Sequence, residues 1–332
     1  MCSCAMIEEA QGANASHTMF VFIGFPETYK HRPWYSVPLL LSYLLVLVGN
    51  SLLLYIIHNT KSLHSPMYIL VSTLAVVDIV NPTAIIPKML LGLLFDLSEI
   101  TLAGCLTQMF ITHFFSSVES TILLAMALDR YVAICHPLRY AEIVNNALFA
   151  KLLIFTLVRS GAIMLTLVGL VVPLSFCGSN IISHCYCDHM ALVSLACNNT
   201  DKNNAMGVAV IVCFVGFDIS LIFFSYVSIL HVVLRAAAGE DRWKAFHTCG
   251  THLMVMMSFY LVGSVTFLSH NLHSPIPVDV NTFLGLLYII FPATVNPIIY
   301  GVRTKEIRHT IVRMFKVQAN KVCVVQISSV KK

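Results

Sequence analysis

The sequence predicts an all-α membrane protein, built as a bundle of seven helices that crosses a lipid bilayer. Hydrophobic residues make up 58% of the 332 residues and charged residues only 11%, with a mean hydropathy of +0.82. These values lie far from those of an ordinary soluble domain. The chain also contains seven apolar stretches, each with about the 20 residues that a helix needs to span the hydrocarbon.

The seven stretches follow one another with short polar breaks between them. We expect transmembrane helices near residues 35–58, 66–91, 105–134, 147–174, 205–234, 244–270 and 280–302. The breaks are polar or carry Gly, Pro, Asn and Asp, as turns between helices commonly do. Three segments therefore follow: an extracellular segment 1–34, a seven-helix bundle 35–302, and a cytoplasmic tail 303–332. Basic and apolar residues alternate at helical spacing over residues 303–316, which predicts a short amphipathic helix lying on the anionic inner leaflet.

The basic residues predict the orientation of the bundle. Fifteen of the 20 Lys and Arg residues fall on the side of the first, third and fifth connections and the tail, four fall on the other side, and Arg159 lies inside the fourth stretch. The positive-inside rule then places the amino terminus outside and the carboxyl terminus in the cytosol. Asn14 and Asn198 begin Asn-x-Ser/Thr glycosylation acceptors, and both fall on the outer side.

The 11 cysteines divide according to this topology. Cys105 opens the third stretch on the outer side, and the second outer connection carries four more, namely Cys177, Cys185, Cys187 and Cys197. The outer face is oxidising, so disulfides are expected there. The string from His184 to His189 also resembles a cluster of metal ligands, but a disulfide would consume Cys187, and we expect no metal site.

Charged and polar residues inside the helices mark the functional positions. Asp129 and Arg130 stand at the end of the third stretch, where an unpaired charge in hydrocarbon would cost several kcal/mol, so they mark the cytoplasmic edge or a switch. Asp78 is an intramembrane carboxylate, and Asn50 and Asn296 are its expected hydrogen-bond partners. Glu119, about three turns before Arg130, has two alternatives: a sodium or proton site shared with Asp78, or a protonated carboxyl bonded across helices.

Motifs in several helices resemble those of rhodopsin-like G-protein-coupled receptors. They are Gly49-Asn50, Leu74-Ala75-Val76-Val77-Asp78, Asp129-Arg130-Tyr131 and Asn296-Pro297-Ile298-Ile299-Tyr300. A narrower resemblance, over nearly the whole chain, is to vertebrate odorant receptors. It rests on Leu63-His64-Ser65-Pro66-Met67-Tyr68, residues 126–140, Ser225-Tyr226 and residues 244–253. The long second outer loop, with His113 and Glu119, is most similar to the class I, or fish-like, branch.

The odorant-receptor resemblance implies a switch and two disulfides. Release of Arg130 from Asp129 on activation would open a cleft for a G-protein helix, and Tyr226 and Tyr300 are placed to hold the open form. Tyr131, Tyr260, Asn296 and Pro297 belong to the same set of positions. The resemblance pairs Cys105 with Cys187 and Cys177 with Cys197, which leaves Cys185 over.

The resemblance also sets a ligand pocket in the outer half of the bundle. One face of the third helix offers Met109, Thr112, His113 and Ser116. Opposite them the resemblance places Val210, Phe214, Gly263, Ser264, Phe267 and Leu286. Such a wall suits a small, weakly polar molecule held by burial and one or two hydrogen bonds. His113 would meet a ligand carboxylate or hydroxyl, or simply bond a neighbouring helix. Thr112 stands where amine receptors carry an aspartate, so an amine ligand is disfavoured.

These expectations describe an odorant receptor at the plasma membrane, expected in the cilia of olfactory sensory neurons. Its partners would be a small odorant, an olfactory-type stimulatory G protein that raises cyclic AMP, trafficking chaperones and membrane lipid, but no nucleic acid. An alternative is the same scaffold used outside the nose to sense a metabolite or steroid. A transporter or channel is remote because paired broken helices are not seen. An enzyme is not expected, because neither His-Glu-x-x-His nor Gly-x-Ser-x-Gly occurs.

Overall fold

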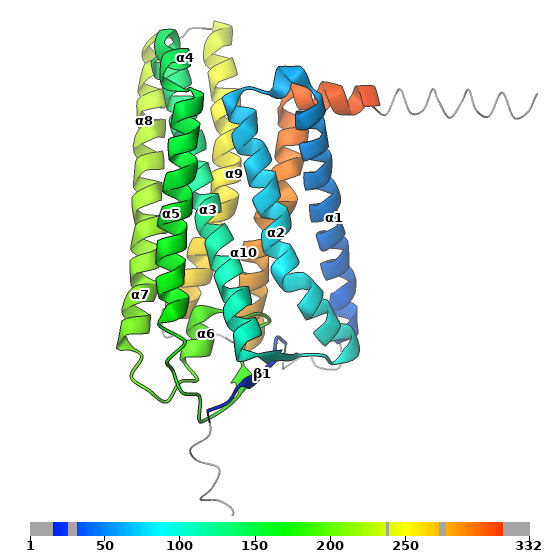
Figure 1. Ribbon diagram of the computed structural model, residues 1–332. Coiled ribbons are helices and arrows are strands. Elements are labelled where there is room, and N and C mark those ends of the chain that lie inside the picture. The colour runs from blue at the N-terminus through cyan, green and yellow to red at the C-terminus, as the bar shows by residue number, and fades with distance from the viewer. Residues whose placement is uncertain (1–15, 26–31, 237–238, 272–276, 315–332) are drawn as a thin grey trace, which may run out of the picture.

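Seven long helices form one bundle in the computed structural model, which describes residues 16–25, 32–236, 239–271 and 277–314 (Figure 1). Six of the seven spans each lie within a single helix, namely α1 (Arg32–Asn59), α2 (Pro66–Phe95), α3 (Leu102–Cys135), α5 (Asn146–Gly169), α9 (Gly239–Asn271) and α10 (Val278–Arg303). The fifth span consists of α7 (Asp201–Ile211), a π-helical turn η4 (Val212–Phe217) and α8 (Asp218–Ala236). All seven are long and apolar enough to cross a membrane, which confirms the predicted fold class.

The helix boundaries differ from the predicted ones where local signals were misread. The fourth span ends at Gly169, earlier than the predicted 174, because Pro173 disfavours helical geometry in the residue before it. The second span continues to Phe95 and ends at Asp96, whose φ of 59° is left-handed. The sixth span begins at Gly239, several residues before the predicted start.

A small sheet, which was not predicted from the sequence, closes the outer end of the bundle. β1 (Met19–Phe22) pairs antiparallel with β2 (Glu99–Thr101) and parallel with β3 (Ile181–Ile182), in the order β2-β1-β3. Phe20 and Phe176 meet edge to face beneath it, with ring centroids 5.2 Å apart. The amino-terminal segment and the second outer loop are thereby held against the start of α3.

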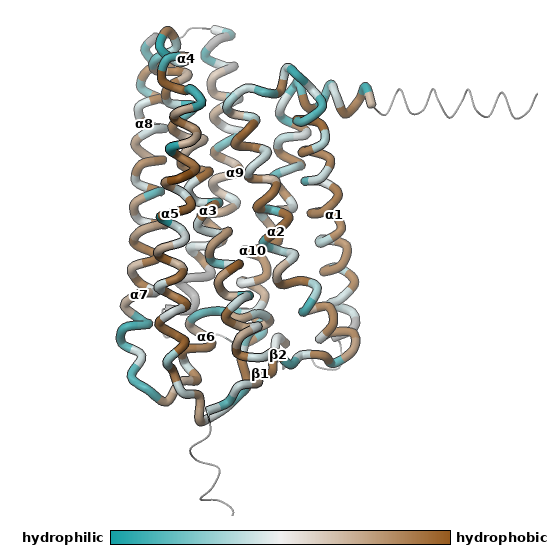
Figure 2. The backbone as a smooth tube through the Cα atoms, viewed as in Figure 1, coloured by the Kyte–Doolittle hydropathy of each residue, from teal (hydrophilic) through white to brown (hydrophobic). Residues whose placement is uncertain are grey.

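The packing of the bundle follows its lipid environment. A large apolar cluster fills the cytoplasmic half and includes Leu74, Leu123, Met126 and Tyr300. Apolar residues predominate along α1, α2 and α5, whereas polar residues are more frequent at the two ends of the bundle (Figure 2). Leu41 and Phe224 are more than 60% exposed, as lipid-facing side chains should be. After α10, residues 305–314 form the short helix predicted for the tail (Figure 1).

Candidate functional site

A cavity of about 640 Å³ lies in the outer half of the bundle, where the ligand was expected. Its walls come from α3, α5, α7, η4, α9, α10 and the second outer loop. Six of the predicted residues line it, namely His113, Ser116, Val210, Phe214, Gly263 and Ser264. The lining is mainly apolar, with hydroxyl groups and imidazoles at intervals, so the cavity suits a small organic molecule.

Three predicted lining residues do not reach this cavity. Met109 is fully buried in an outer cluster with Cys105, Phe176 and Cys187. Thr112 is also buried and does not line the cavity, and Leu286 packs into a separate cluster under the outer loop. Phe267 lies outside the residues whose side chains the structure describes. Helical spacing alone could not fix how far each helix is rotated.

The second outer loop supplies lining residues that the sequence reading missed. His184, Tyr186, Asp188 and His189 all line the cavity. The disulfide between Cys105 and Cys187 fixes the loop over α3 and so places these residues at the cavity. Because they flank Cys187 in the sequence, the predicted disulfide could have indicated them.

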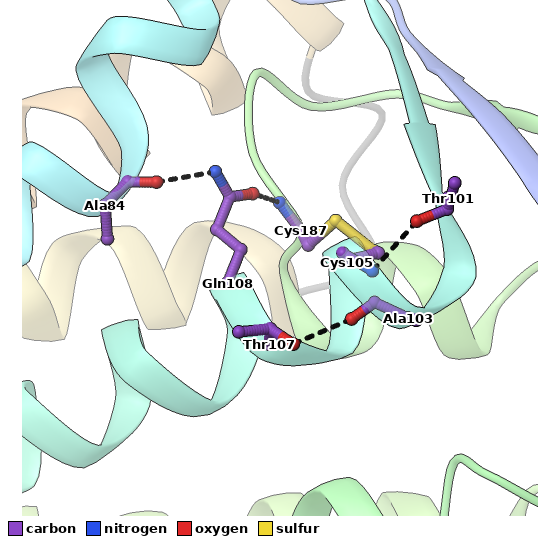
Figure 3. Close-up of a disulfide and its surroundings, with 8 residues drawn as sticks. Ala84, Thr101, Ala103, Cys105, Thr107, Gln108 and Cys187 are labelled. Carbon is purple, nitrogen blue, oxygen red and sulfur yellow. Dashed lines mark hydrogen bonds between the residues drawn. A yellow bond between two sulfur atoms is a disulfide. The ribbon is translucent and has the colours of Figure 1, made fainter.

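The loop is held by more than the covalent bond. The Cys187 backbone N–H donates to Gln108 Oε1 at 3.0 Å, and Gln108 Nε2 donates to the Ala84 carbonyl at 2.9 Å (Figure 3). Cys177 and Cys197 form the second disulfide within the loop. Gln108 thus ties the loop to α2 as well as to α3, and the cavity has a fixed outer cover.

Two imidazoles in the cavity wall have polar atoms with no protein partner. Among the described residues, His113 Nε2 and His189 Nε2 are both buried without a hydrogen bond. A buried polar atom left unpaired costs roughly 1–3 kcal/mol. A ligand with a polar group at either atom would recover part of that free energy.

The charge state of His189 follows from its burial. Removal from water, with His113 close by, lowers the pKa of His189 from 6.5 to about 4, so its imidazole is neutral at physiological pH. In the unfolded chain the same group takes a proton below its ordinary pKa. Its contribution to stability is therefore complete above about pH 6.5 and is lost as the pH falls towards 4.

We expect the melting temperature of the purified protein to fall between pH 6.5 and 4, and to fall less in His189→Gln. Thermal melts of both proteins across this range make the comparison. Equal pH dependence in the two proteins would contradict a neutral, buried His189. Between pH 7 and 8 the neutral imidazole should leave ligand binding unchanged.

Cys185 is a buried thiol that belongs to neither disulfide. Burial raises the pKa of Cys185 above its usual range, and Cys187 is used by the disulfide. Four side chains of the string from His184 to His189 line the cavity, whereas Cys185 packs in a separate cluster under the outer loop.

A polar cluster lies inside the bundle, on the cytoplasmic side of the cavity. Asn296 Nδ2 donates to Asp78 Oδ2 at 3.0 Å, as expected. The expected bond from Asn50 to Asp78 is absent among the described residues, because Asn50 Nδ2 donates instead to the carbonyls of Val46 and Ala293. Glu119 is buried close enough to Asp78 for their charges to interact, and its Oε1 has no partner among the described residues.

Arg159, which had no identifiable partner in the sequence, forms an ion pair within the bundle. Its Nη2 lies 2.9 Å from Asp218 Oδ1. Asp218 was missed altogether, although a lone acid inside the apolar run 205–234 was a signal of the same kind as Arg159. Only the folding of α5 against the fifth span brings the two together.

The predicted ion pair between Asp129 and Arg130 is present at the cytoplasmic end of α3. The Tyr140 hydroxyl also donates to Asp129 Oδ1 at 2.7 Å. Burial and this bond raise the pKa of Tyr140 above its usual range, so the phenol keeps its proton. Arg130 lines a second cavity of about 440 Å³ that includes His247 of α9 and Tyr300 of α10.

The remaining predicted switch residues are spread between the cytoplasmic end of the bundle and the outer cavity. Tyr131 faces His136 at 3.4 Å, and the Tyr226 hydroxyl is buried with no partner among the described residues. Pro297 lies against Gly49, where a Cβ would stand 3.1 Å from Pro297 Cγ, so α1 and α10 pack closely there. Tyr260 lies farther from the cytoplasmic end, at the outer cavity, and its hydroxyl forms a hydrogen bond with Ser120.

The two predicted glycosylation sites differ in what the structure describes. Asn198 is exposed in the second outer loop, and its Oδ1 accepts a bond from the Ser175 backbone at 2.6 Å. Asn14 lies outside the described residues.

Comparison with known proteins points to one group of relatives. A family model described as olfactory receptor matches residues 39–318. Human olfactory receptor 51E2 is 40% identical over 93% of this chain and 96% of its own length, and human olfactory receptor 52K2 is 41% identical over 90% and 95%. The crystal structure of squid rhodopsin matches with a TM-score of 0.70 and 16% identity, over 89% of this chain and 90% of that one, which supports the fold alone.

Proposed function

The chain belongs to the olfactory receptor family, and we propose that it binds a small, mostly apolar odorant in the outer cavity and activates a stimulatory, olfactory-type G protein that raises cyclic AMP. The family and the seven spans make it a multi-pass membrane receptor rather than an enzyme. The observation that carries the proposal is the outer cavity of about 640 Å³, closed by the disulfide-bonded loop.

The wall of that cavity favours a small ligand with little polarity. Val210 and Phe214 offer apolar contact, while His113 Nε2 offers one unpaired polar atom. Burial of apolar surface stabilises a complex by roughly 25 cal/mol per Å², and a hydrogen bond then orients the ligand. These are the properties of the cavity that suit a volatile organic molecule.

The cytoplasmic end of the bundle has the parts of a two-state switch. Arg130 is held by Asp129 beside the cavity that α3, α9 and α10 share. A ligand shifts such an equilibrium only by binding the active bundle more tightly than the resting one. In the proposal, release of Arg130 opens this cavity for a helix of the G protein. Ciliary localisation and dependence on trafficking chaperones are parts of the same proposal.

A sodium ion between Asp78 and Glu119 would be a further part of the resting state. The supporting observation is the pair of buried carboxyl groups, with Glu119 Oε1 unpaired among the described residues. Carboxylate and amide oxygens from Asp78, Glu119 and Asn296 would supply the kind of ligands that a hard cation takes. We expect sodium to raise the melting temperature of the purified receptor relative to choline at equal ionic strength, and Glu119→Gln to remove the difference. Equal sodium effects in both proteins would contradict this site and favour a protonated Glu119.

The experiment for the function as a whole is a cyclic AMP assay. Cells that express the chain with trafficking chaperones would receive alcohols, aldehydes, carboxylic acids and steroids, with Arg130→Ala as the signalling control. We expect responses to some members of the panel, and none in the control at matched surface expression. Silence across the panel, with ligand-independent cyclic AMP no higher than in Arg130→Ala, would contradict the proposed function.

A further inference from the structure

A buried ion pair lies directly behind the inner end of the outer cavity. Arg159 of α5 places Nη1 3.2 Å from Asp218 Oδ2 and Nη2 2.9 Å from Asp218 Oδ1, so the contact is bidentate. Asp218 is fully buried, and the Arg159 guanidinium also lies 4.3 Å from the centre of the Phe214 ring. The guanidinium donates to both oxygens of the Asp218 carboxylate and balances its charge.

The π-helical turn η4 completes the setting of Arg159. Arg159 Nη2 also donates to the Cys213 carbonyl at 2.5 Å. A π-helical turn leaves carbonyls outside the regular hydrogen-bond ladder, so this one can accept from a side chain. Both charges are therefore satisfied inside the bundle, and neither is left for a ligand.

A hydrogen-bond chain runs from Asp218 to the cavity. Ser120 Oγ lies 2.7 Å from Asp218 Oδ2, 3.2 Å from the Phe214 carbonyl and 2.9 Å from the Tyr260 hydroxyl. The serine has one proton, and the carboxylate is the strongest and nearest of the three acceptors. Ser120 therefore donates to Asp218, and the Tyr260 hydroxyl donates to Ser120.

This order of donors fixes what the cavity presents at its inner end. Ser120 and Tyr260 both line the cavity. The Tyr260 proton is committed to Ser120, so a ligand that reaches the Tyr260 oxygen meets only an acceptor. An oxygen that acts only as an acceptor forms a hydrogen bond with a ligand that carries a donor. It repels the oxygen of an ether, ketone or carboxylate.

The rest of the lining supports a neutral ligand. Among the described residues, no Lys or Arg lines the cavity, whereas Asp188 does. His189 is neutral because burial lowers its pKa to about 4. A carboxylate would lose its hydration without gaining a fixed positive charge, which is costly.

Resting on the proposed function of the same cavity, we propose that Tyr260 is a specificity-determining hydrogen-bond acceptor, and that the receptor selects neutral ligands with a hydroxyl donor, such as alcohols and phenols. The polarity is set from behind by Asp218 through Ser120. Phe214 and Val210 hold the carbon skeleton, and the hydroxyl points to the inner end of the cavity.

The test compares ligands of similar shape, of which some carry a hydroxyl hydrogen-bond donor and the others do not. A library of small aliphatic, alicyclic and aromatic alcohols is matched with isomeric ethers or the corresponding ketones and acids, including benzyl alcohol with anisole and benzoate, cyclohexanol with methoxycyclopentane, and borneol with camphor. Binding is measured by the melting temperature of the purified receptor, and signalling by cyclic AMP. We expect alcohols to exceed their donor-free partners in apparent affinity by about tenfold or more.

Two variants separate the hydrogen-bond polarity from general damage to the cavity. Tyr260→Phe should lower the affinity of alcohols and leave that of ethers. Ser120→Ala removes the nearer acceptor of the Tyr260 proton, at 2.9 Å, and leaves only the backbone carbonyl of residue 120 at 3.5 Å. The proton then becomes available to a ligand, and the affinity of ethers and ketones should rise. Tyr43→Phe, whose hydroxyl donates to Thr83 outside the cavity lining at 3.1 Å, is the matched control and should change neither. His113→Phe should leave the preference for alcohols over ethers in place.

The results distinguish a failure of the role assigned to Tyr260 from a failure of the proposed function. Ligands without a donor that bind as well as alcohols, or a preference that survives Tyr260→Phe and disappears in His113→Phe, would overturn the assignment of Tyr260 while the proposed function stands. Binding by none of the alcohols would overturn it as well. In that case, ligand-independent cyclic AMP that Arg130→Ala removes would still support receptor function.

Discussion

Replacement of Arg159 by methionine is expected to remove most of the receptor from the cell surface and to lower its thermal stability sharply. The substitution keeps a long apolar stem but leaves the fully buried Asp218 carboxylate without its ion-pair partner. Breaking a buried pair by removing one partner typically costs about 3–5 kcal/mol, which is a large fraction of the stability of most folded domains. Flow cytometry of intact cells and melts of the purified receptor would measure the two effects.

Two control variants distinguish the effect of breaking the buried ion pair from the effect of removing a positive charge. Arg139→Met removes an exposed arginine that pairs with Glu142 at 3.1 Å, and it should have little effect because both side chains are more than 60% exposed. The double variant Arg159→Met with Asp218→Leu should recover much of the expression, since neither charge is then buried alone. Normal surface expression of Arg159→Met would contradict a structural role for the pair.

Replacement of Arg130 by alanine is expected to abolish cyclic AMP signalling while leaving ligand binding in place. Arg130 lies beside the cytoplasmic cavity, and the outer cavity is formed by other residues. In the proposal, the released Arg130 lines the cavity that receives the G-protein helix, so the substitution should remove that contact without altering the ligand contacts. We expect no cyclic AMP response above that of cells without the receptor.

The test combines cyclic AMP assays with ligand-induced thermal shifts on the same variant. Arg139→Ala, in the connection that follows α3, is the control for loss of a cytoplasmic positive charge and should signal normally. A full response from Arg130→Ala at equal surface expression would contradict the role of Arg130. Loss of the thermal shift would show instead that the variant damages the outer cavity.

Much of the bundle could be predicted because the bilayer imposes strong rules on sequence. Each span must be long and apolar, so residues 66–91 and 280–302 lay within the observed α2 and α10. A charged pair at a helix end must be compensated, which pointed to Asp129 and Arg130. The cysteines of the outer loop were placed by topology, although their pairing came from family resemblance.

The contacts that shape the cavity were harder to predict because they join distant parts of the chain. Arg159 and Asp218 are 59 positions apart and meet only when α5 packs beside the π-helical turn, whose position the apolar pattern does not reveal. Met109 and Leu286 are apolar at suitable spacing but are turned into neighbouring clusters. The three-stranded sheet depends on pairing of β1 with a segment about 80 residues away and with another 160 residues away, and such short strands leave little local signal.

A large side chain placed in the outer cavity should block the odorant response, because this cavity is the proposed ligand site. Val210 lines the cavity, whereas Val212, two residues along the same span, is 63% exposed on the lipid-facing surface. We would measure odorant-evoked and ligand-independent cyclic AMP for Val210→Trp and Val212→Trp at matched surface expression. We expect Val210→Trp to lose the odorant response but to keep ligand-independent signalling, and Val212→Trp to keep both. An undiminished odorant response in Val210→Trp would contradict the proposed ligand site.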